Sequence, residues 1–429
     1  MAEDAQGIPA RTAAQDILRT VLNRRRSLDT LLDSLNHLPP RDAGFARAIV
    51  SETLRRFGQL DMLIRAFVSK PPPSHKSGPT MEILLTGACE LLFLDVPAHA
   101  AVDAANRLAQ ADSKAVHFKP LINAVLRRVS REGKDVLGGK DGTRLNTPDW
   151  LWARWSAAYG QDGARAIASA HAREAPLDIV AKTSFAQGEN IFGNVFRLTD
   201  NARVEDLPGF AEGEFWVQDA AATLPAHILG DVRGQRVFDL CAAPGGKTMQ
   251  LAAKGAIVTA VEREAERMKR VEENLARTKL TATLVSADLR DFTPDELAPF
   301  VLLDAPCSAT GTIRRHPDLP WIKGASDVTL CASAAGELLD SAADLTAPGG
   351  LLVFAVCSLE PEEGVEQVED FLRRREDFSR AKLTPDDVFG HAEWISAEGD
   401  LRTLPCHLSD KGGMDGFYAA RLRRRVIPG

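Results

Sequence analysis

The sequence predicts two structural parts, an all-α bundle followed by an α/β domain built on a mostly parallel sheet. Apolar residues recur at helical intervals between Arg11 and Ser130. After Gly234 the pattern changes to short apolar runs that alternate with helical segments, which is typical of a parallel sheet. The chain of 429 residues is long enough for about three units and needs no disulfide or metal support for its cores.

Prolines divide the helical part into separate helices. Breaks are expected at Pro39–Pro40, at Pro71–Pro73 and at Pro97, because proline ends a helix or starts a new one. About five to seven helices joined by short turns therefore form a predicted domain at residues 1–131. The next stretch is rich in glycine and charge, and it predicts a linker at residues 132–145.

A further boundary is expected where the helical pattern gives way to the α/β pattern. Residues 146–215 begin with a tryptophan-rich helical stretch and predict a small helical or α+β subdomain that contacts RNA. Residues 216–429 then form the α/β domain. Its expected strands are Val237–Leu240, Ile257–Val261, Thr283–Ser286, Phe300–Leu303 and Leu351–Val356, with Gly416–Leu422 as an added edge strand.

Composition excludes several classes of protein. The formal charge of −7 provides no overall positive field, so any contact with nucleic acid has to come from local basic patches. No apolar run is long enough to span a membrane, and the N-terminal segment does not resemble a secretory signal. We expect a cytoplasmic monomer that does not bind a membrane. The six cysteines show no zinc-binding spacing, so free thiols and no metal site are expected.

A glycine-rich turn follows the first expected strand of the α/β domain. It runs from Cys241 to Thr248 and leads into a helix, so a ligand can approach the backbone closely there. The first glycine of a phosphate-binding GxxxxGK[ST] loop would fall on Cys241, and the GxGxxG spacing of dinucleotide sites is missing. The turn therefore predicts a nucleoside-type ligand at the carboxyl ends of the strands.

Carboxylates follow the next three strands. Glu262 lies 23 residues beyond Asp239, where an acid is placed to accept hydrogen bonds from both ribose hydroxyls. Asp288 follows the third strand, in position for an adenine amino group, and Asp304 closes the fourth. Three acids at successive strand ends favour a ligand site over ordinary solvated loops.

Cys307 and Cys357 each follow an expected strand, at the edge that carries the glycine-rich turn. Two thiols beside a methyl-donor pocket suit methylation at carbon 5 of a pyrimidine. That carbon is a poor nucleophile until a thiolate adds to carbon 6, which is covalent catalysis. A base then removes the carbon 5 proton, and an acid near the ring nitrogen stabilises the developing charge; Asp304 is the candidate for that contact. Spacing alone leaves open which cysteine attacks.

Several motifs together make the sequence resemble the Sun/Fmu family of RNA cytosine-5 methyltransferases, which use S-adenosylmethionine. They are Trp216–Ala221, Asp239–Thr248, Asp304–Ser308, Val356–Ser358 with Pro361–Glu363, and Asp415–Leu422. The helical part resembles a NusB-type RNA-binding domain, for example at Asn123–Arg128, so the resemblance is nearly full length. It implies a Rossmann-like class I methyltransferase domain with a mostly parallel, seven-stranded sheet. One departure is Val356, where the family usually has threonine.

The resemblance also implies the substrate and the roles of individual residues. The substrate would be small-subunit (16S) ribosomal RNA, with Cys357 as the nucleophile, Cys307 assisting product release and Asp304 positioning the cytosine. The residues implied to line the S-adenosylmethionine pocket are Cys241, Ala242, Ala243, Pro244, Gly245, Gly246, Lys247, Glu262, Asp288 and Asp304.

Alternatives remain open at this point. Cys307 would be the nucleophile in an arrangement resembling DNA cytosine methyltransferases. A tRNA methyltransferase would use the same chemistry, whereas the intact thiol pair disfavours an RNA-binding or antitermination module without activity. The expected RNA contacts are Arg314, Arg315 and His316 after the Cys307 loop, and Arg127 and Arg128 in the helical part.

Overall fold

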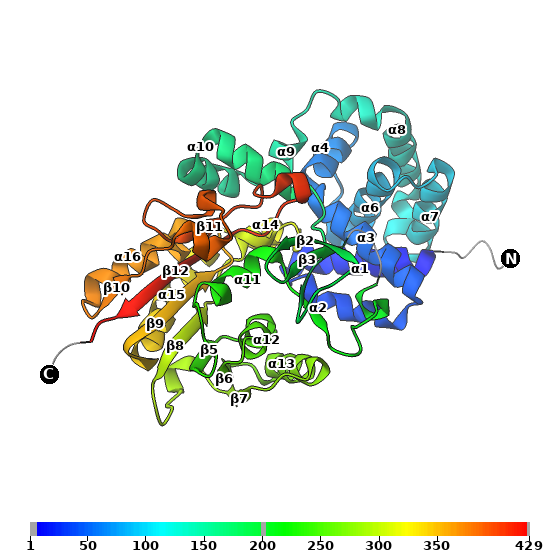
Figure 1. The fold of residues 1–429 in the computed structure, drawn as a ribbon. Helices are drawn as coiled ribbons and strands as arrows, with labels where there is room; N and C mark the ends of the chain where they lie inside the picture. The colour runs from blue at the N-terminus through cyan, green and yellow to red at the C-terminus, as the bar shows by residue number, and fades with distance from the viewer. Residues whose placement is uncertain (1–6, 199–202, 427–429) are drawn as a thin grey trace. The chain divides into compact units, whose positions relative to one another are not determined.

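The computed structural model describes residues 7–198 and 203–426, and its internal contacts divide the chain into two units (Figure 1). One unit comprises Met1–Arg173 together with Ile313–Gly324, and the other comprises Glu174–Thr312 together with Ala325–Gly429. The short segment Ile313–Gly324 interrupts the second unit in sequence but belongs to the first. The sequence patterns did not predict this exchange.

The described residues of the first unit that have regular structure are helical. Their α-helices are α1 (Ile8–Arg24), α2 (Asp29–Leu32), α3 (Pro40–Arg55), α4 (Phe57–Phe67), α5 (Ser74–Ser77), α6 (Thr80–Phe93), α7 (Ala98–Ala111), α8 (Lys119–Leu137), α9 (Gly142–Leu145), α10 (Asp149–His171) and α14 (Leu319–Ile322). The predicted breaks are confirmed, because α3 begins at Pro40 and α7 begins directly after Pro97.

Helix α6 forms the centre of this bundle. Its side chains Ile83, Leu84 and Ala88 are at most 1% exposed. Gly133 of α8 is also buried, and a Cβ there would lie 3.2 Å from Leu92 of α6. This glycine permits close helix packing. Helix α8 continues to Leu137 and α9 begins at Gly142, so much of the segment expected as a linker is helical.

The region expected as one subdomain, residues 146–215, is divided between the units. Helix α10 belongs to the first unit, whereas the strands that follow it belong to the second. These strands form a four-stranded antiparallel sheet in the order β2-β3-β1-β4. Their bounds are β1 (Asp178–Ala181), β2 (Gly188–Phe192), β3 (Val195–Leu198) and β4 (Phe215–Val217).

The main sheet of the second unit has the order β10-β12-β9-β8-β5-β6-β7, and β11 pairs with β12 outside this path. Strands β5 to β9 run parallel, and the expected strands there are confirmed. Strand β12 is not at an edge as expected, because it pairs antiparallel with both β9 and β10. The bounds are β5 (Arg236–Leu240), β6 (Ile257–Glu262), β7 (Thr283–Ser286), β8 (Ala298–Asp304), β9 (Thr346–Val356), β10 (Phe378–Arg380), β11 (Leu401–Thr403) and β12 (Phe417–Arg424).

Alternating side chains bury both faces of this sheet. Val237 and Phe238 of β5 are adjacent and belong to different apolar clusters. Helices α11 (Ala220–His227), α12 (Gly246–Ala253) and α13 (Ala265–Thr278) contribute to the cluster that contains Val237. Helices α15 (Ala325–Leu345) and α16 (Val365–Arg374) contribute to the cluster that contains Phe238. The parallel core is thus covered on both sides, and the strand ends remain for a ligand.

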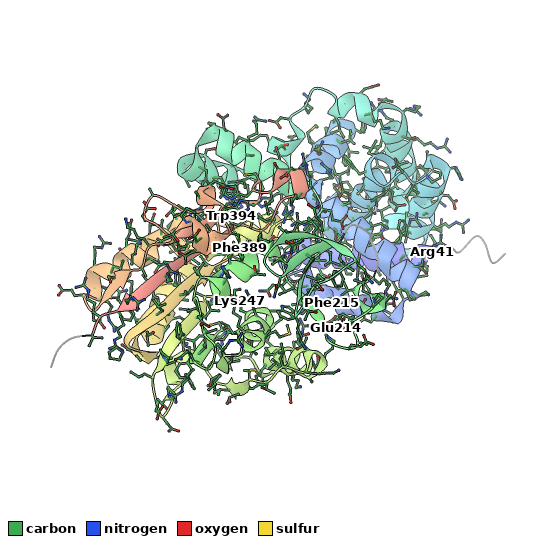
Figure 2. All side chains as sticks on the ribbon, viewed as in Figure 1. Arg41, Glu214, Phe215, Lys247, Phe389 and Trp394 are labelled. Atoms are coloured by element: carbon green, nitrogen blue, oxygen red, sulfur yellow. The ribbon has the colours of Figure 1, made fainter. Side chains whose placement is uncertain are left out.

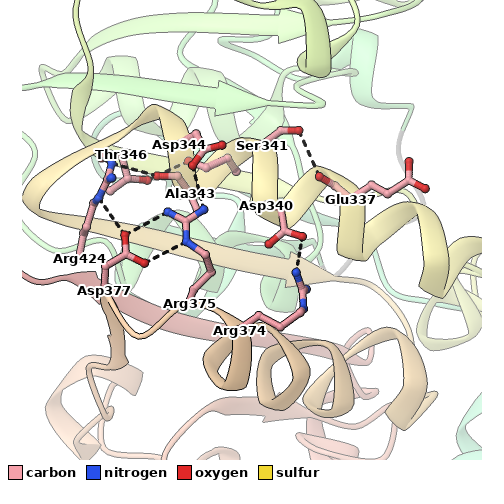
Figure 3. A network of polar contacts seen from close by, with 11 residues as sticks. Glu337, Asp340, Ser341, Ala343, Asp344, Thr346, Arg374, Arg375, Asp377 and Arg424 are labelled. Carbon is pink, nitrogen blue, oxygen red and sulfur yellow. Dashed lines mark hydrogen bonds and ion pairs between the residues drawn. The ribbon is translucent and has the colours of Figure 1, made fainter.

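Ion pairs connect α15, α16 and the antiparallel end of the sheet (Figure 3). Arg375 bonds to Asp377 at 2.9 Å and to Asp344 at 2.8 Å. Arg424 of β12 donates to the Thr346 carbonyl at 2.6 Å. These arginines therefore have structural partners on neighbouring elements.

A buried histidine makes the stability of the first unit depend on pH. His171 of α10 contacts Trp155, and neither of its ring nitrogens has a hydrogen-bond partner among the described residues. Burial, with Arg314 and Arg55 nearby, lowers the pKa of His171 from 6.5 to about 3. Between these values the unfolded chain binds more protons, so the free energy of unfolding falls with falling pH, by about 1.4 kcal/mol at pH 5.5.

We therefore expect His171→Phe to lose less stability than the wild type between pH 7.5 and pH 5.5. Urea unfolding of both proteins at the two pH values measures this difference. His99→Phe, at an exposed position of α7, is the matched control and should behave like the wild type. Equal losses in the wild type and His171→Phe would contradict the assignment.

Candidate active site

The glycine-rich turn connects the end of β5 to α12. Cys241 and Gly245 have φ values of 60° and 100°, and the Ala243–Pro244 bond is cis. The Gly245 amide donates to the Ala242 carbonyl at 2.8 Å. A Cβ at Gly245 would also approach the Val271 side chain to 3.1 Å, so glycine suits both the conformation and the packing.

Asp239 lies below this turn and is completely buried. One carboxylate oxygen, Oδ2, accepts a hydrogen bond from the Thr248 hydroxyl. The other, Oδ1, has no partner among the residues that the structure describes. Burial raises the pKa of Asp239 to about 7. An unpartnered buried acceptor at a strand end indicates a place for a polar group of a ligand.

The raised pKa has a measurable consequence for the protein without ligand. The stabilising contribution of the neutral Asp239 carboxyl is present at low pH and is lost as the pH rises through about 7. We expect Asp239→Asn to show a smaller loss of thermal stability between pH 5 and pH 8 than the wild type. Asp295→Asn, at an exposed site, is the control. The same loss in all three proteins would refute this explanation.

Glu262 and Asp288, two of the three acids that follow the next strands, already have partners. Glu262, at the end of β6, accepts the amides of Ala243 at 3.4 Å and Glu264 at 3.0 Å. Asp288 forms two bonds with the Arg290 guanidinium, at 2.9 and 2.8 Å, which lower the pKa of Asp288. Both acids lie next to neighbouring strands of the sheet, β6 and β7. A bound ribose or base would therefore contact carboxylates that hydrogen bonds already hold in place.

The structure brings the two predicted thiols together. Cys307 follows β8 and Cys357 follows β9, and these strands are parallel neighbours. The two Sγ atoms are 3.4 Å apart. The contact with Cys357 and burial raise the pKa of the Cys307 thiol, so Cys307 holds its proton. This thiol can then donate to the sulfur of Cys357.

Asp304, the last residue of β8, forms an ion pair with Lys247 from the first turn of α12. The distance between Nζ and Oδ2 is 2.7 Å, and Lys247, which is labelled in Figure 2, also lies over the Phe417 ring. The sequence placed Lys247 in the cofactor turn but gave no indication of this pair. Asp304 ends β8, the strand adjacent to β5, so it lies at the sheet edge beside the glycine-rich turn.

The side chains predicted to contact RNA differ in their exposure and in their partners. Arg314 is only 1% exposed and is not available to a phosphate in this structure, which corrects the expectation for that side chain. Arg315 is exposed, and His316 pairs with Asp29 at 3.2 Å. The three belong to the segment that joins the first unit.

In helix α8, Arg127 and Arg128 are both exposed. Arg127 donates to Asn123, whereas Arg128 pairs with Glu132 at 2.8 Å. Contact of these side chains with RNA stays a prediction.

Residues 7–198 and 203–426 contain neither a cluster of metal ligands nor a membrane-spanning helix. No group of three or more His, Cys, Asp or Glu side chains in these ranges is arranged to hold a metal ion. No helix in them is long and apolar enough to cross a membrane.

Family models match both parts of the chain. Residues 226–423 match the model described as 16S rRNA methyltransferase RsmB/F, and residues 8–131 match the NusB family. The fold and the site thus define an S-adenosylmethionine-dependent methyltransferase with an N-terminal NusB domain.

Relatives match over nearly the whole chain. The "Ribosomal RNA small subunit methyltransferase B" of Pseudomonas putida is 37% identical and covers 96% of this chain and 98% of its own length. The protein of the same name from Pasteurella multocida is 34% identical, with 98% and 97% covered. The chain belongs to the family of ribosomal RNA small subunit methyltransferases B.

Solved structures share the fold. The crystal structure of PH0851 has a TM-score of 0.77 at 21% identity and covers 97% of this chain and 99% of its own. A methyltransferase homologue from Pyrococcus horikoshii has a TM-score of 0.54 at 24% identity, with 68% and 98% covered.

The residues at the turn fit the cofactor of this family. Asp239 offers an unpartnered buried oxygen directly before the turn, and Gly245 supplies the positive φ of 100° that the turn needs. Glu262 and Asp288 are acceptors suited to hydroxyl and amino groups. Sequence reasoning missed the free oxygen of Asp239, because only burial distinguishes this acid from others in strands.

Proposed function

We propose that this protein methylates carbon 5 of a cytosine in 16S ribosomal RNA through a covalent bond between Cys357 and carbon 6. The observation that carries the proposal is the pair of sulfurs 3.4 Å apart at the ends of β8 and β9. Bound S-adenosylmethionine supplies a methyl group activated by a positively charged sulfur. We propose Cys241 to Lys247, Glu262, Asp288 and Asp304 as the residues that hold it.

The residues of the chain then have separate roles. The Cys357 thiolate adds to carbon 6, and its electron pair makes carbon 5 nucleophilic. Asp304, held in place by Lys247, donates a proton to the ring nitrogen and so neutralises the negative charge that develops there on addition, and it takes this proton back after methyl transfer. A base then takes the carbon 5 proton, the electron pair of that C–H bond re-forms the double bond between carbons 5 and 6, and the bond between sulfur and carbon 6 breaks so that Cys357 leaves as a thiolate. Cys307 assists this release.

The state of Cys307 supports Cys357 as the nucleophile. A thiol whose pKa is raised remains protonated at neutral pH and is a poor nucleophile. The Cys357 sulfur lies 3.4 Å from this thiol, within hydrogen-bond reach of it. The opposite assignment would require Cys307, whose pKa is raised, to attack as a thiolate.

The names of the relatives support ribosomal RNA as the substrate. A cytosine in folded RNA has to leave its stack to reach Cys357. Extrusion of one base costs about a few kcal/mol of free energy. The exposed Arg127 and Arg315 are proposed to contact phosphates and offset this cost. Action on ribosomal RNA places the enzyme in the cytoplasm.

Transfer of tritiated methyl groups to naked 16S rRNA, assembled 30S subunits and tRNA tests the proposal. We expect label in one of the first two substrates and 5-methylcytosine on digestion to nucleosides. Label confined to tRNA would indicate a tRNA methyltransferase, and no label in any substrate would indicate an RNA-binding module. Cys406→Ala, which leaves Cys307 and Cys357 in place, controls for general effects of losing a cysteine.

A further inference from the structure

Each of the two thiols is followed by a serine, and both serines contact the same carboxylate. Ser308, Ser358 and Glu363 are all 0% exposed. Glu363 Oε1 accepts the Ser308 amide at 2.7 Å, and its Oε2 accepts the hydroxyls of both serines. One buried side chain therefore joins the residues that directly follow Cys307 and Cys357.

The pairing between β8 and β9 does not extend to the thiols. The ladder between β8 and β9 ends where the Ala305 amide donates to the Ala355 carbonyl at 2.8 Å. Beyond that bond the two cysteines lie on separate loops. Apart from the bond between the Gly311 amide and the Cys357 carbonyl, at 3.0 Å, their separation depends on side chains.

Further bonds surround the shared carboxylate. Thr310 of the first loop contacts the Ser358 hydroxyl at 3.3 Å and accepts the Leu359 amide at 3.0 Å. The Ser358 hydroxyl also accepts the Glu360 amide at 3.0 Å. Every link in this network runs between the two loops or within the turn that carries Glu363.

Burial of the Glu363 carboxylate costs free energy, and filling space in the core does not require it. Burial raises the pKa of Glu363, whereas its bonds to the two serines lower it. Among the described residues, its hydrogen-bond donors are the two serines and not cations. A buried carboxylate without a cation is expensive, and an apolar side chain would fill the same space more cheaply. The carboxylate offers several acceptor positions in one place, which an apolar group lacks.

We propose that Glu363 is a positioning residue that sets the distance between the Cys307 and Cys357 thiols by holding the serine next to each. It does not touch the reacting atoms and acts through Ser308 and Ser358. The inference rests on the proposed function in treating these thiols as the reacting groups. Its first test, however, requires neither RNA nor cofactor.

The rate at which the two thiols form a disulfide depends on their separation. Diamide takes up two electrons and two protons as the cysteines become a disulfide, and mass spectrometry of peptides identifies the 307–357 product. We expect rapid closure in the wild type, closure at least 10-fold slower in Glu363→Ala and an intermediate rate in Glu363→Gln. Glu369→Gln, exposed on α16, should match the wild type. Closure at the wild-type rate in Glu363→Ala would overturn the proposal.

A second pair of variants decides the question if Glu363→Ala does not fold. Ser308→Ala and Ser358→Ala each remove one hydroxyl from the carboxylate and leave the charge unchanged. Slower closure in both, with unchanged thermal unfolding, supports positioning by the network. Wild-type closure in both single variants and in Glu363→Gln would refute it.

Steady-state kinetics then connect the distance to turnover. Glu363→Gln is expected to lower kcat at least 10-fold with an unchanged KM for S-adenosylmethionine, and Glu363→Ala to lower it further. Equal loss in both, accompanied by a lower melting temperature, would indicate a merely structural role. If the closure rates change as expected but Cys357→Ala still methylates RNA, the positioning role stands and the proposed function fails.

Discussion

Cys357→Ala is expected to abolish methyl transfer, whereas Cys307→Ala is expected to accumulate a protein–RNA adduct that survives denaturing electrophoresis. Without the Cys357 sulfur, carbon 5 of the cytosine has no route to become nucleophilic. Without Cys307, addition and methylation still occur, but release of the enzyme slows. The contact of 3.4 Å between the sulfurs makes such a division of roles possible.

The double variant sharpens this expectation. Cys307→Ala/Cys357→Ala should form no adduct, because the attacking atom is missing. The exposed-site variant Glu369→Gln should turn over like the wild type and leave no adduct. An adduct in Cys357→Ala, and none in Cys307→Ala, would reverse the two roles.

Asp304→Asn is expected to lower kcat by about 10²- to 10⁴-fold, the range typical of acid–base assistance. Asparagine keeps the size of the side chain but cannot donate a proton to the ring nitrogen, and it loses the ion pair with Lys247 at 2.7 Å. The affinity for S-adenosylmethionine should fall much less than kcat, because Asp239, Glu262 and the backbone of the turn still hold the cofactor. Rates from single-turnover assays, with cofactor affinity from calorimetry, separate the two effects.

Asp291→Asn serves as the matched control, since Asp291 is exposed and lies in a different loop. It should change neither rate nor affinity. A wild-type kcat in Asp304→Asn would remove this residue from the proposed chemistry.

The sequence predicted the elements whose residues interact locally or in register. Val237–Leu240 was found as a strand because buried parallel strands are short apolar runs. Thr283–Ser286 is only partly buried and was found from its β-branched and apolar residues. The turn from Cys241 to Thr248 was found because glycine and proline are the residues that tight turns favour. The thiols were placed together because parallel neighbours end at one edge of a sheet.

Features that depend on contacts between distant residues could not be predicted. Trp321 donates to the Leu54 carbonyl at 2.9 Å, and the Leu28 amide donates to Asp318 at the same distance, so Ile313–Gly324 joins the helical unit. No local pattern reveals such partners. For the same reason the burial of Arg314 could not be read from a basic cluster in the sequence.

The side-chain pairs of the site could not be predicted from the sequence either. Lys247 and Asp304 are 57 residues apart, and Glu363 meets Ser308 across 55 residues. Their residue types were noticed only as parts of motifs. Which atoms they contact depends on how the loops beyond the sheet fold.

The position of the nucleotide in the trapped adduct tests the central claim most directly. Cys307→Ala is incubated with S-adenosylmethionine and the labelled RNA substrate, digested with nuclease and protease, and analysed by tandem mass spectrometry. We predict a peptide that carries 5-methylcytidine nucleotide mass on Cys357. A nucleotide on any other residue, or methylated RNA without any cysteine adduct in either single variant, would contradict the covalent mechanism.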